Sequence, residues 1–176
     1  LVTGVLIGGV VSPTQVGSAS DSANYAAIET GLLNEQERVF AQVYDRVAPS
    51  VVSITTAAAA RTSAGDRFFD AGTGSGFVID TQGHIVTNFH VVDNADRVEI
   101  NMFDGTITSA EVVGLDPDSD IAVLKVDVPA DRLRPVPFAD SNNVSIGQMV
   151  LAIGNPFQND WTLTSGIVSA TNRRIV

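Results

Sequence analysis

The feature that most constrains the fold of this 176-residue chain is a series of short β-rich runs that begins at residue 50. Turn residues separate the runs, and Asp104-Gly105 between two alternating runs is a strong signal for a β-hairpin. Many short strands at this spacing indicate an antiparallel barrel or sandwich, so the chain is predicted to be all-β. The expected strands cover residues 50–56, 74–80, 84–89, 97–103, 106–113, 121–126, 148–153 and 162–170.

Three other stretches differ from this pattern. Residues 34–47 carry a capping signal and apolar residues at helical spacing, and Pro49 follows, which predicts one amphipathic helix. Residues 57–71 are mostly small or polar and are expected to form a surface loop. Residues 1–11 are apolar and uncharged but shorter than the roughly 20 residues that span a bilayer. We expect the end of a signal peptide or signal anchor there, with an apolar arm or a buried strand as alternatives.

Composition excludes several classes of function. The chain has 20 acidic and 10 basic residues, a net charge of -10, and such a chain repels phosphate backbones. No nucleic-acid partner is therefore expected. The absence of cysteine excludes disulfides, thiol catalysis and zinc-thiolate sites.

The chain has two histidines, His84 and His90. His84 follows the expected turn at residues 81–83 and is interpreted as a solvated hairpin residue. His90 lies at the end of the next expected strand and precedes a stretch, residues 91–96, that is expected to form a short helical turn. On its spacing alone, His90 would be a buried structural histidine.

Three aspartates, Asp116, Asp118 and Asp120, alternate just before another expected strand. A calcium loop of the EF-hand type needs Gly at its sixth position and Glu at its twelfth, where this chain has Ile121 and Asp127. Strands rather than helices flank the turn, so a calcium site is disfavoured. Asp120 leads directly into an apolar strand, where burial is expected and an unpaired carboxylate is costly.

Four sequence blocks connect these residues. They are GSGFVID with GHIVTNFHVV at 74–80 and 83–92, DSDIAVLK at 118–125, GQMVLAIGNPF at 147–157 and TSGIVSA at 164–170. In composition and order they resemble the HtrA/Deg family of trypsin-like serine proteases from about residue 48 to residue 170. The resemblance implies a chymotrypsin-like double barrel and no cofactor or metal. It also implies that His90 is the general base and Asp120 the carboxylate that orients it.

The resemblance divides the chain into three parts. Residues 1–33 would be the signal-anchor remnant and linker, and residues 34–143 the helix and the first, six-stranded barrel. Residues 144–176 would be the opening strands of an incomplete second barrel. The family's nucleophile lies in a Gly-Asn-Ser-Gly-Gly block, but no Gly-x-Ser triplet occurs here. We therefore expect a fragment without the nucleophile that is inactive alone.

The resemblance implies a parent protein that degrades unfolded or damaged proteins in the cell envelope. Its expected partners are unfolded proteins or peptides. The resemblance also implies an extracytoplasmic location, such as the periplasm, with a membrane tether through the N-terminus. It further implies assembly into a homo-trimer. The alternative is a non-catalytic chaperone-like or adaptor barrel, which the presence of both His90 and Asp120 disfavours.

Overall fold

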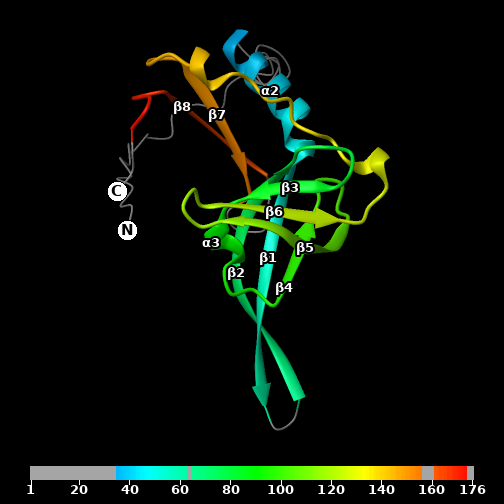
Figure 1. The fold of residues 1–176 in the computed structure, drawn as a ribbon. Coiled ribbons are helices and arrows are strands. Elements are labelled where there is room, and N and C mark those ends of the chain that lie inside the picture. The colour runs from blue at the N-terminus through cyan, green and yellow to red at the C-terminus, as the bar shows by residue number, and fades with distance from the viewer. Residues whose placement is uncertain (1–34, 63–64, 156–160, 174–176) are drawn as a thin grey trace, which may run out of the picture. The chain divides into compact units, whose positions relative to one another are not determined.

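The computed structural model describes residues 35–62, 65–155 and 161–173 (Figure 1). Its main element is a closed antiparallel barrel of six strands in the order β1-β2-β3-β6-β5-β4. The strands are β1 (Val51–Thr62), β2 (Gly65–Val78), β3 (His84–Thr87), β4 (Arg97–Asn101), β5 (Ile107–Asp116) and β6 (Ile121–Val126). The barrel confirms the predicted all-β, trypsin-like fold class.

The barrel forms because β-branched and apolar residues alternate along the strands and point to one interior. In β4, Val98 and Ile100 are buried, while Arg97 before them and Glu99 between them are exposed. Closure pairs β4 with β1 and removes the free edges that an open sheet would expose. The core cluster contains Val52, Ile54, Val78, Ile85, Val92, Val98, Ile100, Met102, Ala122, Leu124, Val126 and Leu133.

The surface loop predicted at residues 57–71 is wrong. β1 and β2 remain paired from Ala57↔Asp70 to Thr62↔Gly65, as a two-stranded ribbon that extends beyond the barrel (Figure 1). A register shift between Thr56 and Ala57 marks the point where the ribbon begins. Ladder hydrogen bonds need only the backbone, so small residues can pair without the alternating pattern that marks a buried strand.

A helix and a second sheet complete the described fold. Helix α2 (Glu35–Val47) has acidic residues in its first turn and Arg46 in its last, which suits the helix dipole. Strands β7 (Met149–Gly154) and β8 (Thr162–Ile167) form a separate two-stranded antiparallel sheet. It is the second sheet that the sequence predicted, with β8 ending three residues before the expected 170.

Three hydrogen bonds join the second sheet to the barrel and the helix. The backbone N–H of Asn155, just after β7, donates to Ser75 Oγ at 2.8 Å. Just before β8, Trp161 Nε1 donates to the carbonyl of Val51 at 2.8 Å, and Tyr44 Oη of α2 donates to the carbonyl of Trp161 at 2.9 Å. The ring of Trp161 also meets that of Phe103 edge to face, with centroids 5.3 Å apart.

Among the described residues, no helix is long and apolar enough to cross a membrane. The expected signal-anchor remnant at residues 1–33 lies outside the described residues.

Candidate active site

Strand pairing brings His90 and Asp120 together although 30 residues separate them. Thr87, the last residue of β3, lies opposite Ala122 near the start of β6. The residues that follow β3 and those that precede β6 therefore meet at the same end of the barrel. His90 lies in the short helix α3 (Phe89–Val92), and Asp120 is the last residue of the β5–β6 turn.

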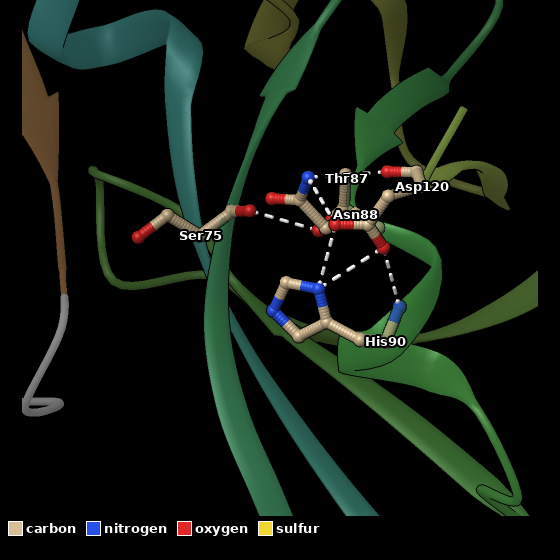
Figure 2. A network of polar contacts seen from close by, with 5 residues as sticks. All are labelled: Ser75, Thr87, Asn88, His90 and Asp120. Carbon is tan, nitrogen blue, oxygen red and sulfur yellow. Dashed lines mark hydrogen bonds and ion pairs between the residues drawn. The ribbon is translucent and has the colours of Figure 1, made fainter. Parts of the chain in front are cut away.

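The two side chains are in direct contact (Figure 2). His90 Nδ1 lies 2.8 Å from Asp120 Oδ2 and 3.0 Å from Oδ1, and the backbone N–H of His90 donates to Oδ1 at 3.0 Å. An ionised carboxylate can only accept hydrogen bonds, so Nδ1 carries the proton in this arrangement. The other ring nitrogen, Nε2, then has a free lone pair and points away from Asp120 (Figure 2).

Asp120 is more accessible than its sequence context predicted. Its side chain is 45% exposed and that of His90 is 70% exposed, so the expected burial of this carboxylate is wrong. The apolar strand does begin at the next residue, but Asp120 lies in the turn and faces α3. The hydrogen bond from the His90 backbone lowers the pKa of Asp120 and outweighs desolvation, which raises it; the His90 side chain and Asn88 lower it further.

Three neighbouring residues hold this arrangement, and none was given a role from the sequence (Figure 2). Asn88 Nδ2 donates to the Asp120 carbonyl at 3.1 Å and to Asp120 Oδ2 at 3.2 Å. The Thr87 hydroxyl donates to the carbonyl of Ser75 at 2.8 Å and so ties the end of β3 to β2. Thr87 and Asn88 have no sequence signal other than proximity to His90, and Ser75 has none, because hydrogen bonds across strands leave no periodic pattern.

Close packing places α3 against β2. A Cβ atom added at Gly74 would come within 2.6 Å of both Cγ atoms of Val91, the residue after His90. Glycine at this position therefore lets α3 lie directly on the backbone of β2.

His84 differs from its predicted role as a solvated residue. Its side chain is 30% exposed, and Nδ1 lies 2.6 Å from Asp80 Oδ2 across the β2–β3 turn. Asp80 Oδ1 also accepts the backbone N–H groups of Gln82 and His84. Burial acts to raise the pKa of Asp80, but the hydrogen bonds from His84 and Gln82 outweigh it and lower the pKa. This pair closes a turn and does not contact His90.

Asp116, the last residue of β5, holds the β5–β6 turn. Asp116 Oδ1 accepts the backbone N–H groups of Asp118 at 3.1 Å and Ser119 at 3.2 Å, and the bonds from Ser119 lower its pKa. Within the described ranges, no group of three or more His, Cys, Asp or Glu residues could hold a metal ion.

No serine hydroxyl in the described part of the chain is hydrogen-bonded to His90. Ser75 is drawn beside it in Figure 2, but its hydroxyl points away from the imidazole and accepts the N–H of Asn155. Within the described residues, the site thus consists of a histidine in contact with a carboxylate, with no serine hydroxyl bonded to the imidazole.

Trypsin-like peptidases place a histidine base against an aspartate, and the contact of His90 with Asp120 at one end of the closed barrel has this arrangement. The family model "Trypsin-like peptidase domain" matches residues 74–175, and the chain belongs to this family. Within it, the chain is homologous to the Deg/HtrA proteases.

Sequence and structural relatives agree on this placement. The chain is 41% identical over 160 residues to Protease Do-like 1, chloroplastic, of Arabidopsis thaliana, covering 89% of this chain and 36% of that protein. It is 49% identical over 102 residues to a probable periplasmic serine endoprotease, DegP-like, of Halomonas elongata, covering 58% and 21%.

Among solved structures, the HtrA-type protease AlgW with a tripeptide matches with a TM-score of 0.65 and 36% identity, covering 77% of this chain and 41% of that one. An AlgW variant with a decapeptide matches with a TM-score of 0.69 and 31% identity, covering 77% and 46%. The chain thus spans less than half the length of each of these relatives.

Proposed function

We propose that this chain contributes the general base, His90, and its orienting carboxylate, Asp120, to a serine endopeptidase of the HtrA/Deg type. The observation that carries the proposal is the contact of His90 Nδ1 with both carboxylate oxygens of Asp120, at 2.8 and 3.0 Å. A serine hydroxyl is a weak nucleophile at neutral pH and needs a base to remove its proton. With Nδ1 protonated and held by Asp120, the free Nε2 lone pair can accept that proton and later return it to the leaving amine.

The carboxylate has two roles in this mechanism. It fixes the tautomer of His90, and its negative charge stabilises the imidazolium that forms when Nε2 is protonated. The lowered pKa of Asp120 keeps this charge present at neutral pH. The nucleophile and the oxyanion-binding groups would come from sequence outside these 176 residues, so we propose that the chain alone is inactive.

The proposed substrates are unfolded or damaged proteins, and the proposed location is outside the cytoplasm, in the periplasm or cell envelope. Peptides in the two AlgW structures and the periplasmic DegP-like relatives support this, while the chloroplastic relatives show that the family also works elsewhere. A membrane tether through the apolar residues 1–11 and assembly into a trimer complete the proposal. Cell fractionation and light scattering on the complete gene product test these last two points.

The decisive experiment compares this chain with the complete gene product. Both are offered an unfolded protein and a fluorophosphonate probe, which labels activated serines. We expect the complete product to cleave and to be labelled and the 176-residue chain to do neither. His90→Ala and Asp120→Asn should lower kcat on the order of 1,000-fold or more.

His84→Ala is the matched control, because it removes the chain's other histidine–aspartate pair without touching His90. An effect equal to that of His90→Ala would refute the assignment. A complete product that folds and binds unfolded protein but neither cleaves nor reacts with the probe would favour the chaperone-like or adaptor alternative.

A further inference from the structure

Asp120 has an unusual backbone conformation for a residue that must hold a precise side-chain position. Its φ is 53°, in the left-handed region that residues other than glycine rarely adopt. It is the last of four residues between β5 and β6, since Asp116 lies opposite Ile121. Among the described residues, the backbone N–H of Asp120 makes one long bond to the turn, to the Pro117 carbonyl at 3.4 Å. The turn therefore needs another restraint to keep this residue in place.

Asn88 supplies that restraint from the end of β3. Its Nδ2 group donates to the main-chain carbonyl of Asp120 at 3.1 Å and to the carboxylate oxygen Oδ2 at 3.2 Å. Both contacts are to acceptors, so the amide must present its NH2 group to Asp120 and not its oxygen. One amide thus holds the backbone and the side chain of the same residue.

The backbone that carries the Asn88 side chain is itself held in place by the preceding residue. Thr87, the preceding residue, is buried, pairs with Ala122 of β6 and donates its hydroxyl to Ser75 of β2. By contrast, the groups that Asn88 joins are accessible: the Asp120 side chain is 45% exposed and that of His90 is 70% exposed. Packing does not hold the pair, so hydrogen bonds must set its geometry.

We propose that Asn88 is a positioning residue that holds Asp120 in its left-handed conformation with the carboxylate facing His90 Nδ1. This inference rests on the proposed function for its catalytic consequence, but its structural part does not need catalysis. Without the amide, the Asp120 peptide can relax toward ordinary φ values and the carboxylate can rotate into water. His90 would then lose the acceptor that keeps its proton on Nδ1.

The structural part can be tested on the 176-residue chain by NMR. The 15N shifts of the His90 ring report which nitrogen carries the proton, and the 13C shift of the Asp120 carboxyl reports its titration. In Asn88→Ala we expect the fraction of His90 protonated on Nε2 to rise several-fold and the pKa of Asp120 to rise. Asn88→Asp, equal in size but without the donor, should raise the Asp120 pKa further because it adds a like charge next to the carboxylate.

Asn142→Ala is the matched control, because Asn142 Nδ2 donates to Asp140 Oδ1 at 2.8 Å in a separate turn. It removes an equivalent amide–carboxylate bond and should leave His90 and Asp120 unchanged. The inference is overturned if folded Asn88→Ala and Asn88→Asp keep the wild-type His90 tautomer and Asp120 titration, or change them no more than Asn142→Ala does.

In the complete gene product, Asn88→Ala should lower kcat on the order of 10-fold with KM unchanged. A fall in kcat without any NMR change would overturn the positioning role. NMR changes in a protein whose wild type never cleaves would support the positioning role and refute the proposed function instead.

Discussion

The barrel and the β7–β8 hairpin are built from similar residues but differ in what they bury. Every member of the core cluster lies in β1–β6 or in the segments that connect and follow these strands, up to Leu133. In the hairpin, Met149, Val150 and Ile167 remain 47%, 42% and 63% exposed. Six strands that close on themselves enclose an interior, while two strands have only open faces and edges. The closure of the six strands into a barrel, and not their apolar content, therefore decides which region buries a core and contributes most to the free energy of unfolding.

The side of the hairpin that is partly covered faces an apolar groove of about 460 Å³. Leu151 and Ile153 of β7 line it together with residues of α2, β1, β2 and the segment 136–139. The hairpin is thus attached to the barrel by one apolar side and by the bonds of Asn155 and Trp161. The following predictions test this contrast, beginning with the largest expected effect.

Truncation of a core residue should separate the two regions most clearly. Ile54 and Leu124 are fully buried, so Ile54→Ala or Leu124→Ala should lower the free energy of unfolding by about 2–5 kcal/mol. Ile167→Ala in β8 removes the same type of side chain from a site that is already exposed and should cost less than about 0.5 kcal/mol. Urea denaturation followed by circular dichroism measures both, and equal losses would show that the hairpin is part of the core.

A glycine-to-alanine pair tests packing without changing polarity. Gly74→Ala places a methyl group against Val91 and should destabilise the barrel by about 1–3 kcal/mol and displace α3 with His90. Gly166→Ala in β8 has open space around it and should change stability by less than about 0.5 kcal/mol. Denaturation midpoints and the amide shifts of residues 89–92 report the two effects. A silent Gly74→Ala would mean that α3 is not held against β2 as described.

The attachment of the hairpin can be weakened at a single atom. Tyr44→Phe removes the hydroxyl that donates to the Trp161 carbonyl and should lower the free energy of unfolding by about 0.5–1.5 kcal/mol. Trp161 is the only tryptophan of the chain, so its fluorescence reports the environment beside Val51 and Phe103. We expect its emission to shift toward the red at lower denaturant than in wild type. An unchanged transition would show that Tyr44 does not help to hold this segment.

The difference between strands that enclose a core and strands that do not also explains which elements of the fold the sequence could predict. The strands of the barrel bury alternate side chains, so residues such as Val98 and Ile100 carry a visible period of two. The ribbon at 57–70 encloses no core, so its Ala-rich sequence carries no such period and was interpreted as a loop. Pairing that depends on backbone bonds alone is invisible in side-chain patterns.

For the His90–Asp120 site, too, the sequence predicted some features and not others. His90 and Asp120 were identified because their sequence blocks resemble those of a family, and the structure brings them into contact. The exposure of Asp120, its left-handed backbone and the bridging amide of Asn88 depend on how a four-residue turn meets the end of β3. Hydropathy marks the strand that follows Asp120 but gives no information on which way the preceding residue faces.

The smallest expected effect concerns acid stability, which the barrel's turns should control. Hydrogen bonds lower the pKa values of Asp80, Asp104, Asp116 and Asp120, which lie in turns between barrel strands or, for Asp116, at the last strand residue before such a turn. Each carboxylate binds its proton less readily in the folded chain than in the unfolded chain. Its contribution to stability is therefore complete above the unfolded-state pKa of about 3.9 and is lost as the pH falls through the lower folded-state value.

We therefore expect the urea midpoint to be nearly constant between about pH 7 and 5 and to fall below about pH 4, where these carboxylates gain protons. Asp120→Asn should make this fall slightly less steep, because its exposed pair with His90 contributes little. Asp118→Asn removes the same charge from the same turn and is the matched control. If the Trp161 fluorescence changed at a higher pH than the barrel's circular dichroism, the hairpin would detach by a separate acid-sensitive step. Coincident transitions would show that protonation of the barrel's turns releases both regions together.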